Sequence, residues 1–298
     1  MNNLVKKINK LKKEKQAVIL VHNYQRPEIY KVADFIGDSL ELAKAAAKTK
    51  AKMIVFCGVD FMAESAKILN PNKKVFLPVL EARCPMANMV DIEGLKKLQK
   101  KYPKAVTISY INTSAETKAH SDICCTSANA VNIVKNIKAK QIIFVPDKNL
   151  AAYVQSQVPS KQIIAWEGFC YVHSRIYLDF INKAKQIHPK ALLIAHPECP
   201  LDVIDLADKV ASTSQMIEFA KKSSAKEFII ATEMGMVNRL QQEVKNKKFY
   251  AAGGVCMQMK KNYLENVYEC LKNEKNEIFV PEKIRIKAKK SLDRMLKV

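Results

Sequence analysis

The stretch Phe249-Tyr250-Ala251-Ala252-Gly253-Gly254-Val255-Cys256 joins a short apolar run to a single cysteine, and the chain contains the same arrangement twice before it. The earlier copies are Val75-Phe76-Leu77-Pro78-Val79, which precedes Cys84, and Ile163-Ile164-Ala165-Trp166, which precedes Cys170. The three cysteines are spaced 86 residues apart. A regular spacing of this length indicates a repeated structural unit rather than a local metal-binding loop.

The repeat extends well beyond the cysteines. Apolar strands are predicted to begin at Ala17, Ala105 and Ala191, at spacings of 88 and 86 residues. Polar residues end these strands in register: first His22, Tyr110 and His196, and two residues later Tyr24, Asn112 and Glu198. Hydroxyl residues then open three predicted helices at the same spacings, at Ser39, Ser127 and Thr213. A second strand, another helix, a third strand and the cysteine complete each unit.

The chain therefore reads as three α/β units, 1–89, 90–175 and 176–261, followed by a tail, 262–298, that we expect to pack back on the first domain. Short apolar strands that alternate with helices predict parallel sheets covered on both faces. Ligands of such sheets bind beyond the carboxyl ends of the strands, where the polar residues lie. One site shared by the three units is the natural expectation.

Composition limits the kind of protein. The 298 residues carry a net charge of +21, and lysines crowd both ends of the chain. The basic runs lack interleaved aromatic residues, so no nucleic-acid partner is expected. We expect no membrane association, because no apolar run is long enough to span a bilayer. The N-terminal segment lacks an apolar signal, which predicts a cytoplasmic protein with reduced thiols.

Three thiolates that meet on a common axis would hold either a metal ion or an iron–sulfur cluster. A cluster is favoured over zinc, because zinc sites usually draw two or more ligands from one short loop and these cysteines are far apart. Such a cluster would leave one iron without a protein ligand, free to act as a Lewis acid. The other five cysteines break the threefold pattern and are predicted to pack in the interior: Cys57, Cys124, Cys125, Cys199 and Cys270.

The polar residues at the strand ends are candidates for substrate contacts and proton transfer. His22 and His196 occupy equivalent positions and suit the binding of a carboxylate or phosphate. Glu198 is the best-placed general acid or base, with His196, Tyr24 and Tyr110 as assisting residues. Ser39, Ser127 and Thr213 are predicted helix starts, where capping and anion binding are both available. Asn112 completes the predicted substrate-binding set.

Together these segments resemble the quinolinate synthase A family of NAD biosynthesis. The resemblance rests on His22-Asn23-Tyr24-Gln25, Phe61-Met62-Ala63-Glu64-Ser65-Ala66-Lys67, Cys84-Pro85-Met86-Ala87, Tyr110-Ile111-Asn112-Thr113-Ser114, Cys124-Cys125-Thr126-Ser127-Ala128-Asn129, Trp166-Glu167-Gly168-Phe169-Cys170, His196-Pro197-Glu198-Cys199 and Thr232-Glu233-Met234-Gly235. It implies three similar α/β/α domains with pseudo-threefold symmetry around a central 4Fe–4S cluster held by Cys84, Cys170 and Cys256.

The resemblance also implies an enzyme that condenses iminoaspartate with dihydroxyacetone phosphate to form quinolinate, with a functional link to L-aspartate oxidase. Two alternatives remain open from the sequence. One is another three-cysteine cluster enzyme of the diphthamide-synthase type, although no adenosine-binding feature is recognisable. The other is a basic nucleic-acid-binding protein with a structural metal.

Overall fold

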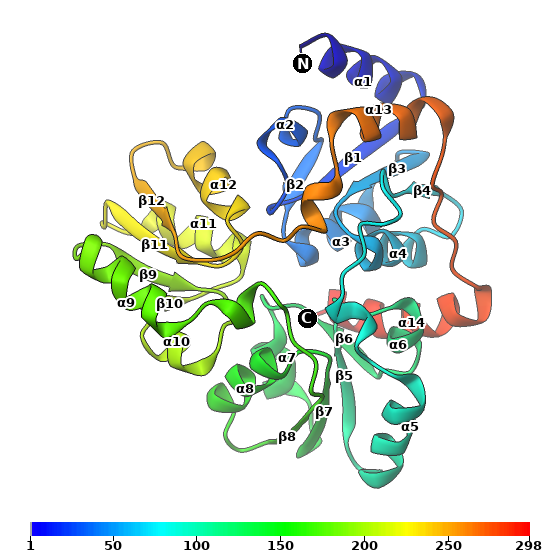
Figure 1. The fold of residues 1–298 in the computed structure, drawn as a ribbon. Helices are drawn as coiled ribbons and strands as arrows, with labels where there is room; N and C mark the ends of the chain where they lie inside the picture. Colours follow the sequence, from blue (N-terminus) through cyan, green and yellow to red (C-terminus); the bar gives the residue numbers. More distant parts are fainter. Residues whose placement is uncertain (1) are drawn as a thin grey trace.

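The computed structural model describes residues 2–298 and contains three four-stranded parallel sheets. Figure 1 shows three lobes, each built on one sheet, arranged around a common centre. All strands of a given sheet come from one of the three predicted units. The strand orders are equivalent: β2-β1-β3-β4, β6-β5-β7-β8 and β10-β9-β11-β12. The predicted α/β class with three similar parallel-sheet units is confirmed.

The first unit begins with a charged helix that lies against its sheet. Its elements are α1 (Asn2–Glu14), β1 (Ala17–His22), α2 (Pro27–Tyr30), β2 (Phe35–Gly37), α3 (Ser39–Lys48), β3 (Met53–Cys57), α4 (Asp60–Leu69), β4 (Lys74–Phe76) and the short 3-10 helix η1 (Met86–Asn88). Every residue of β3 is buried, as expected for a central strand of a parallel sheet that is covered on both faces.

The second and third units repeat this order. The second contains α5 (Ile92–Lys101), β5 (Val106–Tyr110), α6 (Ala115–Ala119), β6 (Ile123–Cys125), α7 (Ala130–Asn136), β7 (Gln141–Val145), α8 (Lys148–Gln157), β8 (Gln162–Ala165) and η2 (His173–Arg175). The third contains α9 (Leu178–Ile187), β9 (Leu192–Ala195), α10 (Leu201–Asp205), β10 (Lys209–Val210), α11 (Thr213–Lys222), β11 (Glu227–Ala231), α12 (Gly235–Glu243), β12 (Lys248–Ala251) and η3 (Met259–Lys261).

The tail forms two helices that return to different units. Helix α13 (Leu264–Asn273) packs against α1 and β3 of the first unit. Helix α14 (Glu282–Leu296) packs against α6 and β6 of the second unit and against α4 of the first. In Figure 1 the orange α13 lies beside the blue α1, while the red α14 lies beside α6. The tail therefore joins the first two units. None of the helices in residues 2–298 is long and apolar enough to cross a membrane.

Each sheet has one strand that the sequence pattern did not predict. Strands β2, β6 and β10 are only two or three residues long and pair with the outer side of the first strand of their unit. Runs this short cannot display the alternation by which a strand is recognised in a sequence.

A carboxylate fixes the entry into each of these short strands. The backbone N–H of Ile19, Thr107 and Leu193 donates to Asp34, Asp122 and Asp208, at 2.8, 2.8 and 2.7 Å respectively. The three aspartates are spaced 88 and 86 residues apart, like the strands they stabilise. We call this set the strand aspartates. Because they satisfy backbone donors inside the sheet, they belong to the scaffold.

Candidate functional site

One pocket is lined by residues from all three units and contains about 750 Å³ of space free of protein atoms. Every site residue predicted from the repeat lies in its lining: His22, Tyr24, Ser39, Cys84, Tyr110, Asn112, Ser127, Cys170, His196, Glu198, Thr213 and Cys256. Within each sheet the strands run parallel, so the loops after their carboxyl ends lie at one edge of the sheet. These loops from the three sheets line the pocket. The structure thus brings the predicted residues together, while their individual roles remain predictions.

The three cysteines occupy equivalent loops. Each follows the edge strand β4, β8 or β12 and precedes the 3-10 turn η1, η2 or η3. All three are free thiols and partly buried. Burial raises the pKa of each thiol above its usual value. Because a thiolate is the form that binds metal, the positive charge of a bound metal would be needed to hold these residues ionised.

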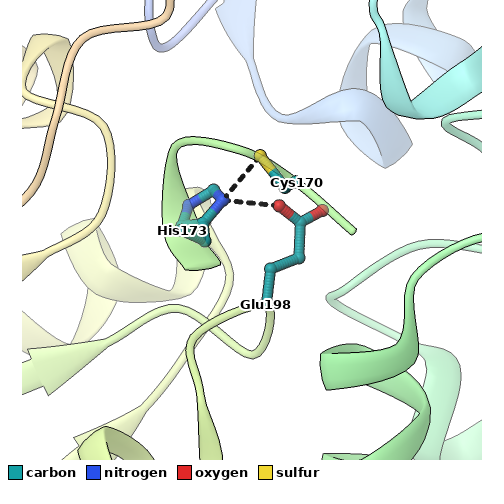
Figure 2. Close-up of side chains that lie close together, drawn as sticks. All are labelled: Cys170, His173 and Glu198. Atoms are coloured by element: carbon teal, nitrogen blue, oxygen red, sulfur yellow. Dashed lines mark hydrogen bonds and ion pairs between the residues drawn. The ribbon is translucent and has the colours of Figure 1, made fainter. Parts of the chain in front are cut away.

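His173 brings the second and third units into contact at Cys170 (Figure 2). Its Nδ1 lies 2.6 Å from Glu198 Oε2 and 3.2 Å from Cys170 Sγ. Burial opposes ionisation of Glu198, but His173 and His196 overcome it and lower the pKa of Glu198 to about 2. Glu198 is therefore a carboxylate at neutral pH, paired with a histidine that can exchange a proton with it.

A chain of hydroxyl contacts leads from this pair to Tyr24. The Nε2 atom of His173 lies 2.8 Å from Thr232 Oγ1, and Thr232 Oγ1 lies 2.5 Å from the Tyr24 hydroxyl. Burial raises the pKa of Tyr24 well above its ordinary value, so the phenol keeps its proton. Glu198, His173, Thr232 and Tyr24 thus form a continuous path along which a proton can move.

His22 and His196 have the same hydrogen bond in their respective units. The Nδ1 atom of His22 accepts the Tyr24 N–H at 3.1 Å, and that of His196 accepts the Glu198 N–H at 3.3 Å. Burial is the main cause that lowers both pKa values to about 3. With Nδ1 as acceptor in a neutral ring, Nε2 carries the proton. Both histidines are therefore neutral donors at pH 7 and not cations.

Two buried oxygen atoms of the lining have no hydrogen-bond partner among residues 2–298: Glu198 Oε1 and Asn112 Oδ1. Buried polar atoms are normally satisfied, so two such atoms in one pocket indicate a ligand that completes them. Tyr110 lines the same space, and burial followed by the Glu198 charge raises its pKa well above the usual value. Tyr110 is thus a protonated donor beside Glu198 in the pocket.

The three hydroxyl residues are not helix caps, contrary to their default role. Ser39 and Thr213 are the first residues of α3 and α11, and the positions before them, Asp38 and Ser212, are the N-caps. Ser127 lies in the turn before α7, which begins only at Ala130. Thr213 Oγ1 accepts a hydrogen bond from Asn23 Nδ2 at 2.9 Å. Since capping does not occupy these hydroxyls, they are free to contact an anion near the helix N-termini.

The remaining cysteines lie outside the pocket lining. Cys57, Cys124, Cys125, Cys199 and Cys270 are all buried, as their departure from the repeat predicted. Of the two glycines before Cys256, only Gly253 lies in a close backbone approach, and this approach is to the end of the neighbouring strand. A Cβ on Gly253 would lie 1.7 Å from the Thr232 carbonyl oxygen, whereas one on Gly254 would meet only Val172 at 3.8 Å.

The sequence interpretation missed His173 and Thr232. His173 stands three residues after Cys170, a spacing typical of paired metal ligands, and that signal could have identified it. Thr232 directly follows β11 but is an ordinary residue type at a strand end, so nothing in the sequence distinguishes it.

Two sets of donors could hold a metal. Cys170, His173 and Glu198 offer ligand atoms that lie within 4.8 Å of one another. The second set is Cys84, Cys170 and Cys256, which line the same pocket from three equivalent loops. The donor chemistry of the second set fits an iron–sulfur group, which takes thiolates, whereas His173 and Glu198 are already paired with each other.

Comparisons with known proteins show which family this chain resembles. The family model described as Quinolinate synthetase A protein matches residues 6–297. A quinolinate synthase of Alkaliphilus metalliredigens is 51% identical over 298 residues, covering 99% of this chain and 98% of the relative. One of Thermodesulfovibrio yellowstonii is 53% identical, with 99% and 98% covered. Quinolinate synthase 1 of Methanosarcina acetivorans is 51% identical over 297 residues, covering 99% of this chain and 97% of the relative.

Proposed function

Because the chain belongs to the Quinolinate synthetase A protein family, we propose that it is the enzyme quinolinate synthase, which condenses iminoaspartate with dihydroxyacetone phosphate. The products are quinolinate, phosphate and water. The observation that carries the proposal is the convergence of the in-register cysteines, histidines, hydroxyls and Glu198 on one pocket. We also infer a functional link to L-aspartate oxidase, because the imine of aspartate is formed by oxidation of aspartate.

We assign Cys84, Cys170 and Cys256 as the protein ligands of a 4Fe–4S cluster. When bound, this cluster supplies a Lewis acid, since three ligands leave one iron open to a substrate oxygen. The unpartnered oxygen atoms of Glu198 and Asn112 in the same pocket support a substrate next to it.

Glu198 is the principal general acid and base in this proposal. Burial opposes its ionisation, but His173 and His196 keep it a carboxylate, the form that can accept a proton from a substrate carbon or nitrogen. His173, at 2.6 Å, orients Glu198 by donating its Nδ1 proton to the carboxylate, and its Nε2 atom connects this pair to Tyr24 through Thr232. Tyr24 and Tyr110 remain protonated because they are buried, and they assist as hydrogen-bond donors to substrate oxygens.

The substrates are anions, and the pocket offers them neutral donors. His22 and His196 present protonated Nε2 atoms, and Ser39, Ser127 and Thr213 present hydroxyls. Helices α3 and α11 begin at Ser39 and Thr213, where the helix dipole favours negative charge. The carboxylates and the phosphate would be bound by these donors without a buried positive charge.

Anaerobic purification followed by iron and sulfide quantification and a quinolinate assay tests the proposal. We expect iron, sulfide and quinolinate formation in the wild-type protein, and loss of all three in Cys84→Ala. Retention of the metal in Cys84→Ala and Cys256→Ala, with loss in Cys170→Ala, would instead assign it to Cys170, His173 and Glu198. A colourless wild-type protein that makes no quinolinate would overturn the proposal.

A further inference from the structure

Each of the three cysteines has its backbone N–H bound by a carboxylate that stands 23 or 24 residues earlier in the chain. Cys84 N donates to Asp60 Oδ1 at 3.0 Å, Cys170 N to Asp147 Oδ2 at 2.9 Å, and Cys256 N to Glu233 Oε1 at 3.1 Å. The acids are 87 and 86 residues apart, so they follow the same repeat as the cysteines. We call Asp60, Asp147 and Glu233 the loop acids.

The loop acids also hold the start of the next helix in their own unit. Asp60 Oδ1 accepts the Phe61 N–H at 2.9 Å, Asp147 Oδ1 accepts the Leu150 N–H at 2.7 Å, and Glu233 Oε2 accepts the Gly235 N–H at 2.6 Å. Each acid follows a central strand, β3, β7 or β11, by two or three residues. A single carboxylate thereby links the cysteine loop to the start of the helix that follows the central strand of its sheet.

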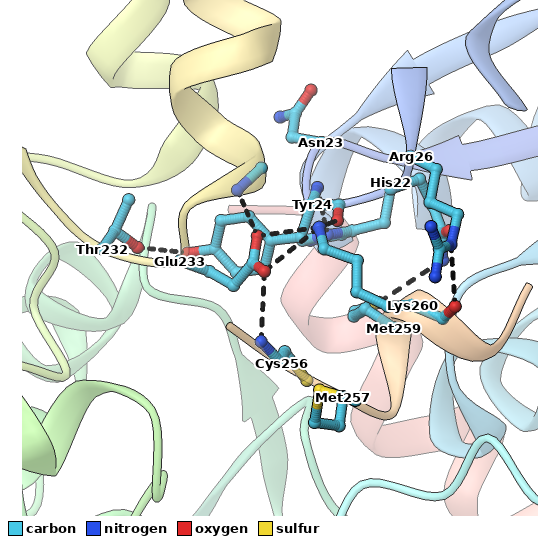
Figure 3. Close-up of polar contacts among 12 residues, drawn as sticks. His22, Asn23, Tyr24, Arg26, Thr232, Glu233, Cys256, Met257, Met259 and Lys260 are labelled. Carbon is cyan, nitrogen blue, oxygen red and sulfur yellow. Dashed lines mark hydrogen bonds and ion pairs between the residues drawn. The ribbon is translucent and has the colours of Figure 1, made fainter. Parts of the chain in front are cut away.

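The third loop acid makes an additional contact with the first unit (Figure 3). Lys260 Nζ lies 3.1 Å from Glu233 Oε1 and also donates to the backbone oxygen of Tyr24. The space is tight: a Cβ on Gly235 would lie 2.6 Å from Lys260 Nζ and 2.8 Å from the Tyr24 oxygen. Glu233 therefore fixes the Cys256 loop relative to the loop that carries Tyr24.

The hydrogen bond from each cysteine N–H is directional, so it forms only while the donor points at the carboxylate oxygen. Asp147 and Glu233 are almost completely buried, at 0% and 1% exposure, so these carboxylates require the donors that the loops provide. The donor is the backbone N–H of the cysteine itself, which only Cα and Cβ separate from the sulfur atom. Rotation of the cysteine backbone, which would swing the sulfur out of the pocket, must break this bond.

We propose that Asp60, Asp147 and Glu233 are positioning residues, which hold the three cysteine sulfurs in place for the group that they bind. The inference rests on the proposed metal role of Cys84, Cys170 and Cys256. Residues that orient metal ligands from behind typically contribute about 10- to 100-fold to metal affinity. The loop acids have that position relative to each cysteine, and none of them lines the pocket except Glu233.

The strand aspartates provide a matched control. Asp34 also accepts a backbone N–H, from Ile19 at 2.8 Å, and it also lies in the first unit. Within residues 2–298 the Asp34 carboxylate contacts no cysteine loop, and its other partner is Lys12 at 2.8 Å. Loss of Asp34 should therefore lower stability without changing how the cysteines are held. Loss of Asp60 should change both.

Asp60 offers the sharpest variants, because its Oδ1 atom alone accepts both N–H groups. Asp60→Asn keeps that oxygen and removes only the charge, whereas Asp60→Ala removes the acceptor. Wild type, both variants and Asp34→Ala would be reconstituted anaerobically, and iron release to a ferrous chelator would be followed. We expect release about 10- to 100-fold faster from Asp60→Ala, and near wild-type release from Asp60→Asn and Asp34→Ala. Melting temperatures of the iron-free proteins would report any general loss of stability.

Release from Asp60→Ala at the wild-type rate would overturn the inference, as would equal loss from Asp60→Ala and Asp34→Ala. Equally fast release from Asp60→Asn would also overturn it, because charge rather than the accepting oxygen would then matter. If Asp60→Ala does not fold, Asp147→Ala and its control Asp122→Ala make the same comparison in the second unit. A wild-type protein that holds no iron would overturn the metal role itself, which distinguishes the two failures.

Discussion

The loops that carry Cys170 and Cys256 have the same construction but different surroundings. Each follows the edge strand of its sheet, has its cysteine N–H bound by a carboxylate, and continues into a 3-10 turn. Three residues after Cys170 stands His173, whose Nδ1 is 3.2 Å from the cysteine sulfur. Three residues after Cys256 stands Met259, and the sulfur of Cys256 instead receives the Tyr171 hydroxyl at 3.7 Å.

This difference distinguishes the residues that place the cysteines from the residues that transfer protons. The equivalent backbone contacts place three sulfur atoms around one centre, a task that needs symmetry. The ionised proton-transfer group, Glu198, meets His173 at 2.6 Å at the border of the second and third units, and the first unit contributes Tyr24 to the path. The positions equivalent to Glu198 are Tyr24 and Asn112, neither of which is a carboxylate. We therefore expect symmetric effects when the cysteines are changed and asymmetric effects when the polar residues are changed.

The largest effect should be symmetric. Cys170→Ala and Cys256→Ala should each lose the iron–sulfur chromophore and all quinolinate formation, because two thiolates cannot replace three. Iron and sulfide quantification together with the quinolinate assay measures this. Cys270→Ser serves as the control, since Cys270 is buried away from the pocket, and it should keep both properties. A stable cluster in Cys170→Ala would contradict the threefold ligand set.

The next effect should be asymmetric. Glu198→Gln should retain iron and bind substrate but lose about 10²- to 10⁴-fold in turnover, because a positioned general acid–base is removed. Asn112→Ala, the change at the equivalent position of the second unit, should raise KM far more than it lowers kcat. Steady-state kinetics on anaerobic protein would separate the two. Near-normal turnover of Glu198→Gln would transfer the proton role to His196 or Tyr110.

A smaller asymmetry is expected at the 3-10 turns. His173→Gln should lower kcat by roughly 10²-fold, because Glu198 loses the partner that orients it. Met259→Leu, at the equivalent position after Cys256, should have little effect on kcat. The iron content of His173→Gln provides the decisive check. If iron is lost together with activity, His173 is a metal ligand and the proton path through it is wrong.

The hydroxyls should affect binding more than turnover. Ser127→Ala and Thr213→Ala each remove a hydrogen bond to a charged substrate group, which contributes about 1.5–3 kcal/mol. We expect substrate binding to weaken by about ten- to a hundredfold, with an unchanged melting temperature for Ser127→Ala, because Ser127 is not a helix cap. Thr213→Ala should also lower the melting temperature modestly, because Thr213 Oγ1 accepts the buried hydrogen bond from Asn23. Titration of the iron-loaded protein with substrate measures the affinity. A sharp fall in melting temperature with normal binding would indicate a purely structural role.

The smallest effect concerns pH and the stability of the metal-free protein. His22 has a pKa lowered to about 3, mainly by burial and further by Lys260. Between the unfolded pKa of about 6.5 and the folded value, the unfolded chain binds more protons, so stability is present above this range and falls on acidification. His22 alone should account for a loss on the order of 2 kcal/mol between about pH 7.5 and pH 5, and His196, whose pKa is lowered in the same way, for a similar one. His22→Gln should reduce that loss in urea unfolding at the two pH values; an unchanged loss would mean that His22 is not neutral.

The repeat made much of the site predictable from sequence. Spacings of 86 and 88 residues aligned the cysteines, the strand-end residues and the hydroxyls, and all of them line one pocket. The loop acids and the strand aspartates also recur once in each unit. They could not be recognised from the sequence, because aspartate and glutamate are common surface residues and the role of each acid here depends on its contact with one backbone N–H. His173 has no counterpart in the other units, because Ala87 and Met259 occupy those positions. Periodicity therefore could not reveal it.

The sequence by itself determined the three units, the parallel sheets and the set of residues that would face a common centre. These follow from local order along the chain, since a strand and the loop after it are adjacent in sequence. Tertiary structure alone decided which units meet: that Glu198 of the third pairs with His173 of the second, and that Lys260 joins Glu233 to Tyr24 of the first. Contacts between side chains far apart in sequence depend on how the units pack, and no periodic pattern records that.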